Sequence, residues 1–202
     1  YFIQLIMNKV ISKLFNTNPI KGNFVHLYHI DVNDSEKILK LRLEERDDNF
    51  LMSTDDNLER QIEYYHNYKT KFDRKEEIYF KIFDVSRNDF SGFVRLTNIN
   101  SKIDFNWESA ILDKKSSPNL FLDLMLIIYS IGFDVLGREV CGPWRVRKNF
   151  KKMMKIHALV GMFEIAYEDE EFYYVQVKKR MYEQKIKYFS KKYLGTLLNL
   201  EI

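Results

Sequence analysis

Apolar residues near the start of the chain recur at intervals of three and four positions. This spacing predicts an amphipathic helix, because it places those side chains on one stripe of the helix surface. Pro19 and Gly22 then end the helix. Such a stripe packs against its own domain, against a second subunit or on a membrane surface. The stripe consists of Met7, Val10, Ile11, Leu14 and Phe15.

The remaining pattern alternates between short strands and helices. Strands are predicted where apolar and polar residues alternate, or where a short apolar run lies between turn residues. Helices are predicted where apolar residues recur with a period of about 3.6 and capping residues flank the segment, as Gly137 does at the end of the helix of residues 119–136. This order indicates a mixed α/β fold in which helices cover a central sheet. The predicted strands are residues 24–30, 78–85, 90–99, 103–112, 139–146, 162–167 and 172–179, and the predicted helices are residues 35–50, 57–72, 119–136 and 149–160.

Residues 103–112 form the clearest strand, because their side chains alternate in polarity over the whole segment. Side chains of a strand point to opposite faces in turn, so the even-numbered positions are predicted to share one polar face. That face consists of Asp104, Asn106, Glu108 and Ala110, and the opposite face consists of Ile103, Phe105, Trp107, Ser109 and Ile111.

The composition excludes several classes of protein. The 202 residues are 46% hydrophobic and include 32 basic and 29 acidic residues, a balance too even to indicate a nucleic-acid partner. Cys141 is the only cysteine, so the chain can form neither an internal disulfide nor a cysteine zinc site. We therefore expect a reducing, cytoplasmic location. His26, His29 and His66 lack the spacing of metal ligands, so no metal site is predicted.

The chain is expected to fold as one domain with two terminal additions. The domain is residues 23–182. The additions are the amphipathic helix and linker of residues 1–22 and a basic, partly helical tail of residues 183–202. No segment reaches the roughly 18 consecutive apolar residues of a membrane-spanning helix, so no membrane span is predicted.

Three stretches carry a resemblance to a known family. They are residues 90–112, FSGFVRLTNINSKIDFNWESAIL, residues 116–137, SSPNLFLDLMLIIYSIGFDVLG, and residues 146–162, VRKNFKKMMKIHALVGM. With the element order, they resemble the GNAT superfamily of N-acetyltransferases. The resemblance implies an α/β GNAT fold, with a mixed central sheet of about seven strands flanked by helices and splayed at the fourth and fifth strands. It also implies acetyl-CoA as co-substrate and direct acetyl transfer to an amine in a ternary complex.

The start of the apolar helix near residue 119 has the chemistry of an anion site. Ser117 suits the N-cap and Pro118 the first turn, and a helix N-terminus offers unpaired N–H groups to a phosphate. Lys114 and Lys115 add positive charge, although the alternative is an ordinary capped helix with solvated lysines. The family's loop carries glycines here, whereas residues 114–120 contain none. By resemblance, the predicted coenzyme-binding residues are Ile111, Leu112, Lys114, Lys115, Ser117, Asn119, Leu120, Arg147, Lys148, Asn149 and Lys151.

Glu108 and His157 are the predicted catalytic residues. A carboxylate on the polar face of a central strand can take a proton from the incoming ammonium group, which must be neutral before it attacks a thioester. The alternative for Glu108 is an ion-paired strand residue. His157 lies where the resembling enzymes often hold a Tyr that protonates the departing thiolate, and an imidazole can donate a proton too. The alternative for His157 is a half-buried residue satisfied by hydrogen bonds.

The two predicted helices before the strands resemble the acceptor region of bacterial GNATs that acetylate amino-sugar nucleotides. The expected substrate is therefore a small amine, a 4-amino-sugar nucleotide of surface-glycan biosynthesis. By this resemblance its ligands are Arg42, Tyr65 and His66, and Asn106 is added because it shares the polar strand face of Glu108. Two alternatives stay open, an N-terminal acetyltransferase of peptides or ribosomal proteins and a GNAT-fold protein that binds a partner without catalysis. The pattern also leaves a homodimer open.

Overall fold

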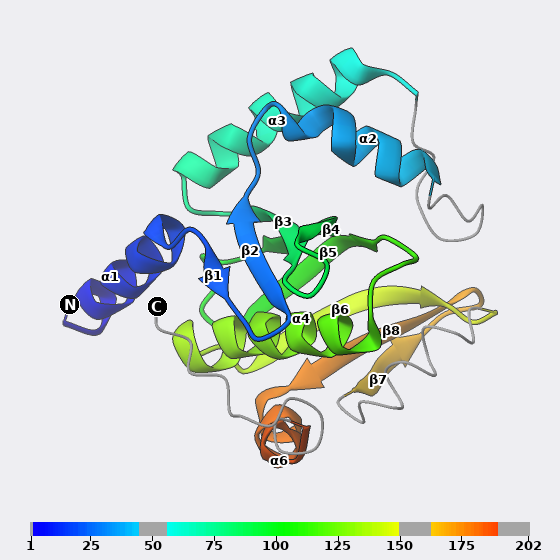
Figure 1. Cartoon of the computed structure of the whole chain (residues 1–202). Coiled ribbons are helices and arrows are strands. Elements are labelled where there is room, and N and C mark those ends of the chain that lie inside the picture. Colours follow the sequence, from blue (N-terminus) through cyan, green and yellow to red (C-terminus); the bar gives the residue numbers. More distant parts are fainter. Residues whose placement is uncertain (1, 45–55, 150–162, 190–202) are drawn as a thin grey trace.

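The computed structural model of the chain describes residues 2–44, 56–149 and 163–189. In these residues eight strands form one mixed sheet in the order β1-β2-β3-β4-β5-β6-β8-β7, with helices on both faces (Figure 1). The predicted α/β fold is confirmed, and the additional strand is β1, which lies within the predicted linker. The strands are β1 Ile20–Lys21, β2 Val25–His29, β3 Ile78–Asp84, β4 Asp89–Thr97, β5 Asp104–Leu112, β6 Val140–Arg147, β7 Glu164–Glu168 and β8 Phe172–Lys178. The helices are α1 Phe2–Asn16, α2 Asp34–Glu44, α3 Leu58–Asp73, α4 Pro118–Ser130, the π-helical turn η1 Ile131–Val135 and α6 Lys179–Phe189.

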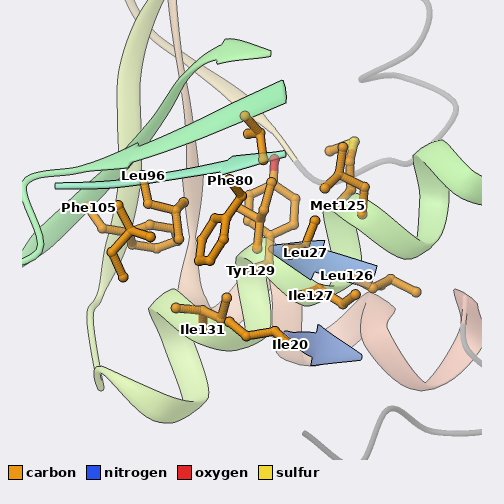
Figure 2. Packing of buried hydrophobic residues seen from close by; sticks show 14 of the residues in the cluster. Ile20, Leu27, Phe80, Leu96, Phe105, Met125, Leu126, Ile127, Tyr129 and Ile131 are labelled. Atoms are coloured by element: carbon orange, nitrogen blue, oxygen red, sulfur yellow. The ribbon is translucent and has the colours of Figure 1, made fainter. Parts of the chain in front are cut away.

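One face of the sheet, which we call the α4 face, packs against α1 and α4. Figure 2 shows strand residues such as Leu27 and Phe80 packed among α4 residues such as Tyr129. Leu14 and Phe15 of α1 belong to the same buried cluster, so the N-terminal helix packs on its own domain. Burying a large apolar side chain contributes about 1.5–3 kcal/mol. This cluster therefore supplies much of the stability that holds the sheet in place.

The helix α4 and the turn η1 run through the centre of the fold. The segment Pro118–Val135 is long and apolar enough to cross a membrane by length and composition, but 67% of it is buried inside the protein. A helix that is apolar on all sides is also typical of a buried core helix. Gly137 ends the segment with a φ of +65°, the left-handed conformation of a helix C-cap. The predicted glycine cap is thus confirmed.

The opposite face, which we call the α3 face, packs against α2 and α3. Ile38 of α2 and Tyr68 of α3 join Tyr79, Phe93 and Ile111 of the sheet in a second buried cluster. The hydroxyl of Tyr68 accepts a hydrogen bond from the backbone N–H of Tyr79 at 3.1 Å. This contact fixes α3 over the start of β3. Both helices therefore cover the central strands of the sheet from this side.

A β-bulge in β5 changes the predicted alternation of side chains. Arg95 lies opposite Glu108, but the residue two positions earlier in β4 lies opposite Ile111, so β5 has one extra residue. Ser109 adopts a φ of +52° at this point. The prediction that Ile111 shares the face of Phe105 is wrong, because the extra residue reverses the alternation. Ile111 lies on the α3 face, and Phe105 lies on the α4 face.

The strands β5 and β6 separate after a short parallel pairing. They pair only over residues 104–105 and 140–141, which confirms the predicted splay between the family's fourth and fifth strands. Gly142 follows with a φ of +105°, and a Cβ there would lie 2.8 Å from the carbonyl oxygen of Val175. Only glycine fits this close approach to β8. Among the described residues, the β6-facing edge of residues 106–112 is therefore left without a strand partner.

Candidate active site

The N-terminus of α4 is capped as the sequence predicts. Ser117 has extended backbone angles, and its Oγ accepts a hydrogen bond from the N–H of Leu120 at 3.1 Å, with Pro118 in the first turn. The preceding loop is held by Asp113, whose carboxylate accepts a hydrogen bond from the N–H of Lys115 at 2.9 Å. This bond is the main cause that lowers the pKa of Asp113. The positive end of the helix dipole is thus fixed directly after β5.

The side chains around this helix start have different surroundings. Lys115 and Asn119 are exposed. Lys114 is also exposed, and its ammonium group donates a hydrogen bond to the carbonyl oxygen of Glu44 in α2 at 3.3 Å. Leu120 is fully buried in the α4-face core. The lysines therefore supply charge near the helix start, while Leu120 anchors it.

The last residues of β5 and the base of the splay are lined by apolar side chains. Ile111 is buried on the α3 face, and Leu112 packs toward the α4 face. The backbone N–H of Trp107 points to the sulfur of Cys141, and the ring centroids of Trp107 and Trp144 lie 5.8 Å apart. Burial raises the pKa of the Cys141 thiol well above its ordinary value, so a reactive thiolate is not formed at neutral pH.

Three predicted coenzyme residues lie at the end of β6. The ammonium group of Lys148 forms an ion pair with Glu168 at 3.2 Å. The guanidinium of Arg147 lies 5.8 Å from the ring centroid of Phe172, and Asn149 is exposed. The Lys148 charge is thus already partnered within the β7–β8 hairpin, whereas Arg147 faces an aromatic ring.

Two further predicted residues, Lys151 and His157, lie outside the described residues. Their roles stay predictions from the sequence. Within the three described segments, no group of three or more His, Cys, Asp or Glu side chains is placed to hold a metal ion.

Glu108 lies on the α3 face of β5, beside β4. Its carboxylate accepts a hydrogen bond from the guanidinium of Arg95 at 2.6 Å and one from the hydroxyl of Thr97 at 3.3 Å. The side chain is 43% exposed. A carboxylate has about four acceptor positions, so these two contacts leave room for a further donor. The residue is therefore both ion-paired and open to a ligand.

Arg95 connects Glu108 to a second acidic group that sequence reasoning missed. Its guanidinium lies 3.5 Å from the carboxylate of Glu77 and donates to the hydroxyl of Tyr64. Glu77 also accepts a hydrogen bond from Lys71 at 2.8 Å. Burial by itself lowers the pKa of Arg95, but Tyr64, Glu77 and Glu108 outweigh it and raise the pKa above its ordinary value. Arg95 is thus a permanent cation shared by two carboxylates.

The predicted acceptor residues of α2 and α3 differ in how close they lie to the sheet. Burial raises the pKa of Tyr79 to about 12, and the nearby charge of Arg42 opposes this shift. The Arg42 side chain therefore extends from α2 toward Tyr79 of β3. Tyr65 is half-buried, with its ring centroid 6.1 Å from that of Tyr68, whereas His66 is exposed. The structure thus brings Arg42 toward the polar groups of the α3 face and leaves His66 on the surface.

Asn106 lies on the same strand, two residues before Glu108. Its side-chain oxygen is buried and has no hydrogen-bond partner within the described residues. A buried acceptor left in this state costs about 1–3 kcal/mol. A donor group on a bound molecule would remove this cost, which makes the Asn106 amide a candidate ligand contact.

These groups define a site with two sides. On the α4 side, the splay leads to a capped, positively polarised helix start, which suits an anionic acyl donor. On the α3 side, the Glu108 carboxylate lies next to the point where β5 and β6 separate. An amine that enters from the α3 side would meet both the carboxylate and the acyl group. The geometry therefore fits transfer between two molecules held in one complex.

Several solved structures share this architecture. A nucleotide-linked sugar GNAT, FdhC, matches with a TM-score of 0.75 and 27% identity, over 90% of this chain and 100% of that chain. The Campylobacter jejuni N-acetyltransferase PseH in complex with acetyl coenzyme A matches with a TM-score of 0.57 and 20% identity, over 76% and 98%. The ribosomal-protein-S5-alanine acetyltransferase from Vibrio fischeri matches with a TM-score of 0.65 and 13% identity, over 81% and 97%. No protein-family model and no curated protein matches the sequence.

The match to the nucleotide-linked sugar GNAT extends over nearly the whole chain. The other two matches have identities of 20% and 13%, so they show the shared fold alone. The chain therefore has the GNAT fold, and these structural neighbours are N-acetyltransferases of the GNAT type.

Proposed function

We propose that the protein transfers the acetyl group of acetyl-CoA to the amino group of a nucleotide-linked amino sugar. The observation that carries this proposal is the similarity to a nucleotide-linked sugar GNAT, which covers 90% of this chain and all of that one. The PseH neighbour was solved with acetyl coenzyme A, which supports the co-substrate. The ribosomal-protein neighbour shares only the fold at 13% identity, so it gives the peptide alternative less support.

The residues present fit acetyl-CoA even though the loop before α4 has no glycine. The first turn of α4 offers N–H groups and a positive dipole end to the pyrophosphate, with Lys114 and Lys115 as additional cations. The open edge of residues 106–112 offers backbone groups to the amides of the pantetheine arm. Acetyl-CoA supplies an activated acyl group at this point. Its thioester would lie near the middle of β5, beside Glu108.

The chemistry follows from these positions. The ammonium group of the acceptor first gives a proton to Glu108, directly or through one water. The neutral amine then attacks the thioester carbonyl, so that a C–N bond forms, the C–S bond breaks and the nitrogen gives up a second proton to solvent. The sulfur leaves as a thiolate and takes up a proton, for which the sequence resemblance predicts His157 as donor. Acetylated amine and free coenzyme are the two products.

Arg95 acts as a positioning residue in this scheme. It holds the Glu108 carboxylate at 2.6 Å and is itself fixed by Glu77 and Tyr64, so the carboxylate keeps one orientation. Arg42 and Asn106 are the proposed ligands of the sugar, because both lie at the polar α3 face. Without these contacts, the Glu108 side chain would sample several rotamers. Proton transfer would then be less efficient, because it needs a fixed geometry.

The test is an acceptor panel in which thiol release from acetyl-CoA is measured. The panel contains nucleotide-linked sugars with an amine at C4 or C3, peptides with a free N-terminus, and spermidine. We expect turnover only with the sugar nucleotides, and the resemblance predicts the C4 amine. Turnover confined to peptides would replace the proposal by the N-terminal acetyltransferase alternative. No turnover with any acceptor, together with no acetyl-CoA binding at millimolar concentration, would favour the non-catalytic alternative.

A further inference from the structure

The last residues of β6 form a separate surface on the side of the sheet away from α4. Val146 is 4% exposed, and Trp144 packs against the α4-face cluster. Side chains of a strand alternate between faces. Arg145 and Arg147 therefore lie on the opposite face, and both are exposed. This places two guanidinium groups on the same side of the sheet as Glu108.

The neighbouring part of this surface is aromatic. The guanidiniums of Arg145 and Arg147 lie 5.4 Å and 5.8 Å from the ring centroid of Phe172 in β8. Tyr174, on the same face of β8, stacks on Tyr167 of β7 with centroids 4.2 Å apart and an interplanar angle of 18°. Tyr167 is 54% exposed, so its ring remains accessible. We call these five residues the arginine–aromatic surface.

The carboxylate of Asp169 lies at this surface, where it accepts a hydrogen bond from the hydroxyl of Tyr174 at 2.9 Å. No carboxylate forms an ion pair with Arg145 or Arg147 in the parts of the chain that the structure describes, whereas the adjacent Lys148 is paired with Glu168 at 3.2 Å. Guanidinium groups bind phosphate oxygens in a bidentate manner. Exposed aromatic rings beside such cations are typical stacking partners of nucleobases. The surface thus has the chemistry of a nucleoside diphosphate site.

The arginine–aromatic surface lies on the same face of the sheet as the proposed amine site. The parallel strands β5 and β6 are in register at the pair Phe105–Cys141. From this pair, Glu108 is three residues further along β5 and Arg145 is four residues further along β6. The two side chains therefore stand at a similar height on the two sides of the splay. A sugar nucleotide can reach both, with its amine at Glu108 and its diphosphate at β6.

We infer that the arginine–aromatic surface binds the nucleoside diphosphate part of the acceptor. Arg145 and Arg147 contact the phosphates, and the base lies against the Tyr167–Tyr174 pair. This inference rests on the proposed function. It also assigns Arg147 to the acceptor, because the coenzyme phosphates are assigned to the start of α4 on the other face of the sheet.

The inference is tested by the steady-state kinetics of two variants, Arg145→Ala and Arg147→Ala. The control is Arg74→Ala, because Arg74 is an exposed arginine directly after α3. Each test variant is expected to raise the KM for the sugar nucleotide by about 10–100-fold, the effect of losing a charged hydrogen bond. The KM for acetyl-CoA and the Tm should stay at the wild-type values. A direct titration with UDP and with dTDP, without acetyl-CoA, should show binding to the wild type and to the control that both test variants weaken.

The outcomes separate this inference from the proposed function. If the wild type acetylates sugar nucleotides and both variants keep their KM, the inference is wrong and the proposed function stands. A raised KM for acetyl-CoA alone would assign the surface to the coenzyme and overturn the inference. If no sugar nucleotide is acetylated, the proposed function fails. The titration with UDP and dTDP then still shows whether the arginine–aromatic surface binds a nucleoside diphosphate. UDP or dTDP binding lost in the variants supports a diphosphate site, whereas no binding at millimolar concentration rejects it.

Discussion

The guanidinium of Arg95 holds the carboxylate of Glu108 at 2.6 Å across the β4–β5 pair, immediately before the bulge at Ser109. The Arg95 side chain is 16% exposed and that of Glu108 43% exposed, so solvent screens the pair and its contribution to stability is modest. The ion pair acts on geometry, because it fixes one orientation of the Glu108 carboxylate. Glu108 is the only acidic residue of β5 between the β6 pairing at residues 104–105 and the bulge.

Replacing Glu108 by Gln tests the proposed base. The amide keeps the shape and a hydrogen bond acceptor but takes up no proton at neutral pH, so turnover should fall by about 10²–10⁴-fold. The KM for acetyl-CoA should not change, because Glu108 lies on the acceptor side. Glu63→Gln, an exposed residue of α3, is the matched control. Wild-type turnover by the Glu108 variant at pH 7 would exclude a base role.

Arg95→Lys tests the positioning role. A lysine keeps the charge but has no fork of donors, so it cannot serve Glu77, Tyr64 and Glu108 together. We expect kcat to fall by about tenfold, which corresponds to the loss of one ordinary hydrogen bond of about 1.4 kcal/mol, while the Tm changes little. Arg95→Met should also lower stability by about 1–3 kcal/mol, because the buried Glu77 carboxylate loses a partner. Unchanged kcat and pH profile in Arg95→Lys would contradict this role.

The double variant Lys114→Ala/Lys115→Ala tests the start of α4 as the pyrophosphate site. Loss of two nearby cations should raise the KM for acetyl-CoA by about tenfold, and more at low salt, because exposed charges are screened over about 10 Å at 0.1 M. The KM for the amine acceptor should stay the same. Lys102→Ala, an exposed lysine before β5, is the control. Equal acetyl-CoA kinetics in double variant and control would remove the lysines from the site.

Asp123 of α4 holds the turn before β2, and its protonation should affect stability. Its carboxylate accepts hydrogen bonds from the N–H groups of Phe24 at 2.6 Å and Val25 at 3.2 Å. Burial nevertheless raises the pKa of this carboxyl above its ordinary value of 3.8. The folded protein then binds more protons than the unfolded chain between the two pKa values. The stabilisation is therefore complete below 3.8 and is lost as the pH rises through the raised pKa.

Thermal denaturation between pH 4 and 7 tests whether the stabilisation by Asp123 is lost as the pH rises. Asp123→Asn keeps an acceptor oxygen without a charge, so the Tm difference between wild type and variant should shift in favour of the variant as the pH rises. Asp123→Ala should cost about 1–3 kcal/mol at every pH, because the two N–H groups lose their acceptor. A Tm difference between wild type and Asp123→Asn that is constant with pH would show that the carboxyl does not titrate in this range.

Much of the local structure could be read from the chain alone, because it depends on neighbours in sequence. The cap at Ser117 and the end at Gly137 follow from interactions within a few residues, and both are confirmed. The order of strands and helices, which carries the family resemblance, could be predicted from the period with which apolar residues recur along the chain. The acceptor side depended on tertiary contacts. In the sequence, Arg95 is a single charged residue within a strand that is mostly apolar, and its partners Glu77 and Tyr64 come from outside that strand.

The bulge at Ser109 shows the same limit within a single strand. Perfect alternation in residues 103–112 predicts one polar face, and no local signal marks the extra residue that turns Ile111 to the other side. The surface of Arg145 and Arg147 likewise depends on β6 diverging from β5 and pairing with β8. By itself, the sequence determined the elements and the core, since each residue's preference for a helix, strand or buried position is local. Only the tertiary structure decided which charges meet, because pairing of distant strands sets register and face.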